Sequence, residues 1–412
     1  MVCIKVLFVA REYPPFEVGG AAVHTFNLVK NLKALGISCK VISFGDQTCS
    51  TSDVLFIPPS SSIISKFNRS LVMDFRIPLD IIKLTKVVRN LIKTEKFDII
   101  HVQEPYVGAF VRQNHKVTTV HDTSYGDIKA LLHSSKSFAS LKRIGFYFLL
   151  GFFLELMCTV SSVAIITPSK QMARELVEIY GTPQNKIRII RSGVNLPNST
   201  ELSSKREAKA RLGLPQDKLL IFTTSQHIPR KRIDTLLNAI LILQRRGVQG
   251  YQVVISGDGP LRNLLMNKSK EYGLSETVKF PGWVSRKNLD LYYQAADIFV
   301  LTSEYEAGPI TLLEAMSFGD AAICTKIEGI PSLMHDGIDG LLFPVGDHVA
   351  LSEHLNLLMN NVAMRRNLSA SAGSFAEKFD WRSVANDTLR VYYRLLREEQ
   401  EPSHERCSFG DQ

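Results

Sequence analysis

Two glutamates in the C-terminal half of the chain lie in a pattern that can hold a ligand. Glu306 and Glu314 are separated by seven residues, which begin as a Gly-Pro loop and continue as an apolar helix. One carboxylate therefore lies in the loop and the other about one turn inside the helix, so both can face one ligand. Carboxylates accept hydrogen bonds from sugar hydroxyls, and N–H groups at a helix start bind phosphate. The residues at this helix start are Gly308, Pro309, Ile310 and Thr311.

A second candidate anion site is the pair Gly19 and Gly20, which follows an apolar strand and precedes the helical pattern Ala21–Leu35. Adjacent glycines let backbone N–H groups approach an anion, and the helix dipole favours negative charge there. A turn that binds nothing is the alternative. The spacing is not GxGxxG, which argues against a nicotinamide enzyme.

Basic residues gather in the segment 229–234, where Arg230, Lys231 and Arg232 lie between a strand and a helix. A fixed cation at such a position can stabilise a leaving diphosphate, although a solvated helix start would have the same composition. His121 follows the apolar strand Thr118–Val120, at the strand end where parallel sheets bind ligands. For His24 and His101 we expect packing or surface roles.

These residues need a scaffold, and short apolar strands alternating with helices predict one. Such a pattern indicates parallel sheets covered on both faces, and it restarts after Leu196. The fold class is therefore α/β with two doubly wound, Rossmann-like units facing each other across a cleft. We expect an acceptor-binding domain over 1–195, a nucleotide-sugar-binding domain over 196–380, a polar hinge over 196–205, and a C-terminal helix over 381–398 that crosses back to the first domain. Strands are predicted at Ile4–Ala10, Cys39–Phe44, Ile99–Val102, Thr118–Val120, Val163–Thr167, Ile187–Ile190, Leu219–Thr223, Gln252–Ser256, Thr277–Phe280, Ile298–Leu301, Ala321–Thr325 and Gly340–Phe343.

The Glu306/Glu314 segment resembles the motif of glycosyltransferase family 4, the retaining glycosyltransferases with the GT-B fold. The resemblance extends from Tyr13-Pro14-Pro15 to the C-terminal helix. It implies that Glu314 holds the ribose of a nucleotide, that Glu306 lies by the donor sugar and takes part in transfer, and that Lys231 neutralises the diphosphate. His121 matches a histidine near the donor.

Smaller segments match the same family. The turn at Gly257 resembles the G-x-G-P turn of its nucleotide domain, and Gly282 with Trp283 resembles an F-x-G segment near the nucleobase. The chain departs from the family where an arginine is expected, since Ser225 or Gln226 stands there. Arg230 or Arg232 is the candidate replacement. Further departures are Arg191, in place of an asparagine, and Ala307-Gly308, where glycine and an aromatic residue are common.

The function that follows is transfer of a hexose from a UDP- or GDP-sugar to a hydroxyl of a sugar- or lipid-linked acceptor, with retention of configuration. No DxD sequence occurs, and we expect no metal and no cofactor beyond the nucleotide sugar. Front-side attack, with the leaving phosphate accepting the proton, is the working mechanism. The alternatives are a GT-B sugar-nucleotide hydrolase or epimerase, and a non-catalytic nucleotide-sugar or membrane-binding module.

Charge and hydropathy bear on the remaining partners. The net charge of +9 favours polyanionic partners, but the basic residues are spread out, so nucleic acid is not expected. An acidic membrane surface is a candidate partner because the segment Lys66–Lys93 is basic and partly amphipathic. The apolar stretch Ile144–Ile166 is interrupted by Glu155, which favours a core helix and strand over a membrane span. The scattered cysteines argue against zinc and fit a cytoplasmic protein, either free or peripheral at the inner face of the cell membrane.

Overall fold

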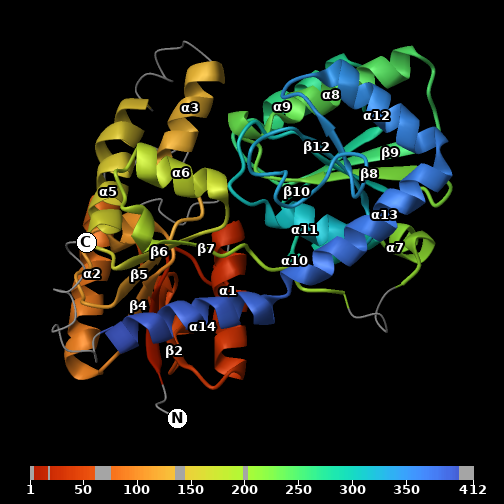
Figure 1. The fold of residues 1–412 in the computed structure, drawn as a ribbon. Coiled ribbons are helices and arrows are strands. Elements are labelled where there is room, and N and C mark those ends of the chain that lie inside the picture. Colours follow the sequence, from red (N-terminus) through yellow and green to blue (C-terminus); the bar gives the residue numbers. More distant parts are fainter. Residues whose placement is uncertain (1–3, 17–18, 61–75, 135–143, 198–202, 399–412) are drawn as a thin grey trace, which may run out of the picture.

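The computed structural model describes residues 4–16, 19–60, 76–134, 144–197 and 203–398 (Figure 1). It contains two parallel sheets, with strand orders β3-β2-β1-β4-β5-β6-β7 and β10-β9-β8-β11-β12-β13. The first sheet consists of β1 Lys5–Val9, β2 Ser38–Phe44, β3 Val54–Ile57, β4 Ile99–Val102, β5 Lys116–Thr119, β6 Ala164–Thr167 and β7 Ile187–Ile189. The second consists of β8 Leu219–Thr224, β9 Tyr251–Ser256, β10 Val278–Gly282, β11 Ile298–Leu301, β12 Ala321–Thr325 and β13 Leu341–Phe343.

Helices cover both faces of each sheet. Around the first sheet lie α1 Gly20–Ala34, α2 Ile77–Thr94, α3 Ser124–Ser134, a π-helix over Tyr147–Phe152, α5 Phe153–Val160 and α6 Lys170–Glu178. The second half contains α7 Lys205–Arg211, α8 Ile233–Arg245, α9 Arg262–Glu271, α10 Arg286–Ala295, α11 Ile310–Ser317, α12 His348–Asn360, α13 Val362–Ala376 and α14 Trp381–Glu398. Short 3-10 turns lie at Gln47–Cys49, Pro105–Gly108, Gln184–Lys186, Pro229–Lys231 and Glu377–Phe379.

The side chains of β1 show why the strands are apolar throughout. Val6 and Phe8 belong to the core on one face of the sheet, whereas Leu7 and Val9 belong to the core on the other face. Because successive side chains of a strand point to opposite faces, a strand covered on both sides is apolar at every position. The predicted fold class, two doubly wound α/β units, is confirmed.

Some elements were not predicted. β3 is a short edge strand that follows a Ser- and Thr-rich segment, so its apolar run is brief, and α13 is interrupted by polar residues.

The apolar stretch Ile144–Ile166 forms the π-helix, α5 and the start of β6, and none of the described helices is long and apolar enough to cross a membrane. The Glu155 carboxylate is buried there and accepts hydrogen bonds from Ser124 Oγ at 2.9 Å and Tyr180 Oη at 2.7 Å. Part of the predicted hinge, 198–202, lies outside the described residues.

The C-terminal helix α14 returns to the first domain, where it packs against α1 (Figure 1). Trp381 and Tyr392 join the core that covers one face of the first sheet. Tyr392 Oη lies 2.6 Å from Nδ1 of His101, whose Nε2 lies 2.7 Å from Thr119 Oγ1. Both ring nitrogens of His101 thus have partners inside this core, as a packing role requires.

Candidate active site

A cleft lies at the carboxyl ends of the strands of both sheets and encloses about 330 Å³. Its lining residues follow β1, β4, β5 and β6 of the first sheet and β8, β9, β10 and β11 of the second. Ligands of open α/β sheets bind at such strand ends because loops and helix N-termini meet there. This cleft is therefore the candidate active site.

Almost all of the predicted site residues line this cleft. They are Gly19, Gly20, His121, Arg230, Lys231, Gly257, Trp283, Glu306, Gly308, Pro309, Ile310, Thr311 and Glu314. Gly282 is the exception. Its φ is 80°, and its carbonyl accepts a hydrogen bond of 2.8 Å from the N–H of Gly257, so it supports the neighbouring turn rather than the cleft wall.

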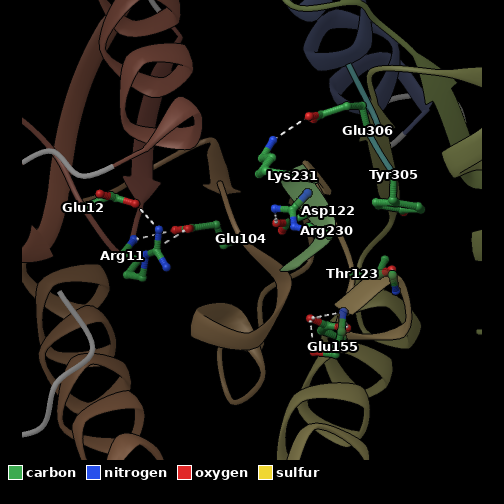
Figure 2. A network of polar contacts seen from close by, with 12 residues as sticks. Arg11, Glu12, Glu104, Asp122, Thr123, Glu155, Arg230, Lys231, Tyr305 and Glu306 are labelled. Carbon is green, nitrogen blue, oxygen red and sulfur yellow. Dashed lines mark hydrogen bonds and ion pairs between the residues drawn. The ribbon is translucent and has the colours of Figure 1, made fainter. Parts of the chain in front are cut away.

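Lys231 and Glu306 form a buried ion pair at the centre of the cleft, with Nζ 2.5 Å from Oε1 (Figure 2). Burial lowers the pKa of Lys231, and the attraction to Glu306 opposes this only in part. Burial would raise the pKa of Glu306, but Lys231 and Arg230 outweigh it and hold this pKa below its usual value. Glu306 is therefore an ionised acceptor at neutral pH, held against a cation.

The structure separates the two candidate arginines of the basic loop. Arg230 lines the cleft, with Nη2 3.7 Å from Oδ2 of Asp122 in the other domain (Figure 2). Arg232 has a left-handed backbone, with φ at 45°, and its guanidinium lies 3.4 Å from Glu304 and 3.5 Å from Asp234. Arg232 does not line the cleft, so Arg230 is the arginine placed beside Lys231.

Glu314 lies on α11, where it lines the cleft and has two strong partners. Tyr293 donates a hydrogen bond of 2.8 Å to Oε2, and Arg286 pairs with Oε1. Arg286 also lies 3.0 Å from Asp290, one helical turn further along α10. Arg286 was not among the site residues predicted from the sequence. Its position at a helix start just after the Gly282-Trp283 segment was the available signal.

A charged cluster on the first-domain side of the cleft was also missed. The backbone N–H of Arg11 donates a 2.9 Å hydrogen bond to Glu104, and its Nε lies 3.2 Å from the same carboxylate. The Arg11 guanidinium also pairs with Glu12 (Figure 2). Charged residues directly after the first strand were the signal for this cluster, because that strand end faces the cleft.

His121 belongs to a small group of aromatic and polar side chains. Its Nε2 lies 3.4 Å from Oε1 of Gln103, and its ring meets that of His24 edge-on with centroids 4.5 Å apart. Burial, followed by the neighbouring His121, holds the pKa of His24 well below its usual value. His24 is therefore neutral at physiological pH and supports His121 by packing.

Contacts between the domains reach the loop that carries Glu306. A side chain at Gly20 would meet Ile310 at 3.7 Å, and one at Gly308 would meet Pro168 at 3.0 Å. The contact at Gly20 would be an ordinary one, whereas the tighter contact at Gly308 shows that this glycine lets the two walls of the cleft approach closely. Among the described residues, no group of three or more His, Cys, Asp or Glu side chains is arranged to hold a metal ion.

Comparison with protein families gives one match for each half of the chain. Residues 18–197 match the family described as Glycosyltransferase Family 4, and residues 204–374 match the family described as Glycosyl transferases group 1. An uncharacterized glycosyltransferase of Methanocaldococcus jannaschii is 25% identical over 94% of this chain and 98% of its own length. A D-inositol 3-phosphate glycosyltransferase of Streptomyces bingchenggensis is 27% identical over 57% of this chain. That match covers only 53% of the relative's own length.

Solved structures share the fold. A sucrose-phosphate synthase from Thermosynechococcus elongatus superposes with a TM-score of 0.79 at 19% identity, over 96% of this chain and all of its own. The Anabaena protein HepE, in complex with UDP-glucose, superposes with a TM-score of 0.71 at 16% identity, over 95% of this chain and all of its own.

Proposed function

This chain belongs to the glycosyltransferases of family 4 and group 1, and from that premise we propose that it is a retaining hexosyltransferase that uses a nucleotide-diphosphate sugar. The observation that carries the proposal is the buried Lys231–Glu306 pair beside the N-terminus of α11. A cation and a row of helix-terminal N–H groups suit a diphosphate, and a carboxylate next to them suits a sugar.

The donor lies along the second-domain wall in this proposal. Its base packs near Trp283 and the Gly257 turn, and its ribose hydroxyls reach Glu314. The diphosphate lies between Lys231, Arg230 and the starts of α1 and α11, and the hexose points to Glu306 and His121. UDP-glucose is the first donor to test, since HepE, which has a similar fold, was solved with that ligand.

Transfer proceeds by front-side attack. The bond between the anomeric carbon and the phosphate oxygen breaks while an acceptor hydroxyl oxygen bonds to the same face of that carbon. The hydroxyl proton passes to the departing phosphate oxygen. Lys231 and Arg230 stabilise the charge that grows on the diphosphate as its bond to the sugar breaks.

Release of nucleoside diphosphate from a panel of UDP-, GDP- and ADP-sugars, with and without a membrane lipid extract, tests the proposal. Release from one donor that an acceptor stimulates is expected, together with its loss in Lys231→Ala and Glu306→Gln. Glu353→Gln, an exposed carboxylate on α12, is the matched control. Free hexose without acceptor would favour the hydrolase, a changed sugar on the intact nucleotide would favour the epimerase, and binding without any release would favour the non-catalytic module.

An exposed apolar surface motivates a further part of the proposal, peripheral attachment to the inner face of the cell membrane. Phe148, Leu149 and Phe153, on the π-helix and α5, are 60%, 73% and 57% exposed. Leu79 and Ile82 of α2, which covers the same face of the sheet, are also exposed, next to the basic residues of that helix. Exposed apolar side chains next to Lys and Arg residues bind anionic lipid surfaces.

Flotation with vesicles tests this attachment. Wild-type protein is expected to float with vesicles that contain anionic lipid at low salt. A Phe148→Ser/Leu149→Ser/Phe153→Ser variant is expected to remain in the dense fraction, without vesicles, while keeping its UDP affinity. Failure of the wild type to float would contradict the attachment and favour an acceptor that is not in a membrane, whereas equal flotation of both proteins would show that these three side chains do not carry it. The basic residues at 66–75 lie outside the described residues.

A further inference from the structure

The two walls of the cleft differ in their charged groups. The second domain contributes Arg230, Lys231 and Arg286 to the lining. On the first-domain wall, Arg11 is the only Lys or Arg among the described lining residues, and the carboxylates of Glu104 and Asp122 line the same wall. Within the described part of the chain, the donor side is therefore rich in cations and the acceptor side is not.

Arg11 is already held by carboxylates. Its guanidinium contacts both Glu12 and Glu104, and the three residues are 8%, 1% and 4% exposed, respectively. Two carboxylates thus share one guanidinium. A buried cation with two such partners is poorly placed to bind a third anion, because the nearer carboxylates repel it.

The cations of the second-domain wall do not make the first-domain wall a better site for a phosphate. Lys231 pairs with Glu306, Arg286 pairs with Glu314, and Arg230 lies 3.7 Å from Asp122. In the proposed function the diphosphate of the donor takes up Lys231 and Arg230. A phosphate on the acceptor would then face Glu104 and Asp122 across a cleft whose positive charge is occupied.

We infer that the acceptor group that enters this cleft is an uncharged polyhydroxyl group, such as an unphosphorylated sugar residue, whose hydroxyls donate to Glu104 and Asp122. Each carboxylate oxygen has two lone pairs, so Glu104 retains acceptor capacity beside Arg11. The inference rests on the proposed function and adds a rule of acceptor choice to it. It predicts a difference from the relatives that are named for D-inositol 3-phosphate.

The first measurement compares glucose with glucose 6-phosphate as acceptors, by UDP release from UDP-glucose. Preference for the neutral sugar is expected, and preference for the phosphorylated sugar would overturn the inference. The second measurement does not need turnover. It determines the Kd of glucose 6-phosphate for protein saturated with UDP, in the wild type, Glu104→Gln, Asp122→Asn and the control Glu353→Gln.

Removal of one carboxylate is expected to tighten glucose 6-phosphate binding at least about tenfold in Glu104→Gln, with UDP affinity and the control unchanged. An equal Kd for glucose 6-phosphate in the wild type and both cleft variants, or no binding by any of the three, would overturn the inference. Failure of the wild type to bind UDP would count against the proposed function alone, and the glucose 6-phosphate comparison would then be made without nucleotide.

Discussion

The hydroxyl of Tyr305 donates a hydrogen bond of 3.0 Å to Glu175, and this bond joins the two domains directly beside Glu306. Tyr305 lies in the loop between β11 and α11, but its ring is buried among residues of the first domain such as Met172 and Leu176. A side chain at Gly126 would meet this ring at 2.7 Å, so the glycine makes room for it. The backbone of Glu306 is therefore held from the first domain.

Tyr305→Phe is expected to lower kcat while leaving UDP affinity unchanged. The ring still fills its pocket, but Glu175 loses one donor and keeps the bond from Thr123 Oγ1. The loss of one buried hydrogen bond should reduce the free energy of unfolding by about 1–2 kcal/mol. Steady-state kinetics, calorimetry and chemical denaturation measure these effects. Tyr393→Phe, an exposed tyrosine on α14, is the control, and an unchanged kcat in Tyr305→Phe would show that the bond only stabilises the fold.

Arg230→Ala is expected to weaken UDP-sugar binding about ten- to hundredfold, the usual effect of losing a hydrogen bond to a charged group. Arg232→Ala should change this affinity less than about threefold, because its side chain extends to Glu304 and Asp234 and away from the cleft. Titration calorimetry with UDP-glucose measures both. A larger loss in Arg232→Ala than in Arg230→Ala would contradict the assignment.

Lys231→Ala is expected to reduce kcat about 10²- to 10³-fold, as removal of a fixed group that stabilises transition-state charge does. The same change leaves Glu306 buried without its cation, which should cost about 3–5 kcal/mol of stability. In the double variant Lys231→Ala/Glu306→Gln the stability should recover in part, because no lone charge remains, while activity stays lost. Recovery of activity in the double variant would mean that the pair is structural.

The sequence was sufficient for residues whose position depends on local pattern. Apolar runs and their spacing predicted the two sheets, and Glu306 with Glu314 followed from one loop and the helix after it. Pairs between distant elements could not be predicted, because the local sequence around one residue does not indicate its partner. Arg286 and Glu314 are 28 positions apart, and Tyr305 and Glu175 are 130 apart.

The basic loop shows a second limit. Arg230, Lys231 and Arg232 are consecutive and chemically similar, so composition alone could not rank them. The left-handed backbone at Arg232, with φ at 45°, turns the chain so that only its two predecessors line the cleft. Such a conformation is uncommon for a residue with a β-carbon and depends on the surrounding packing.

His101 gives a prediction for the dependence of stability on pH. Burial, and secondarily His121, lowers its pKa to about 3, below the usual value of 6.5. Between these two pH values the unfolded chain binds a proton that the folded chain does not, so stability falls as the pH is lowered through this window. At pH 5 the contribution of this one histidine should be a loss of about 2 kcal/mol relative to pH 7. Denaturation of His101→Gln should show a slope against pH that is smaller by about one proton. An unchanged slope in His101→Gln would mean that His101 is protonated in the fold and that its bonds to Tyr392 and Thr119 tolerate the charge.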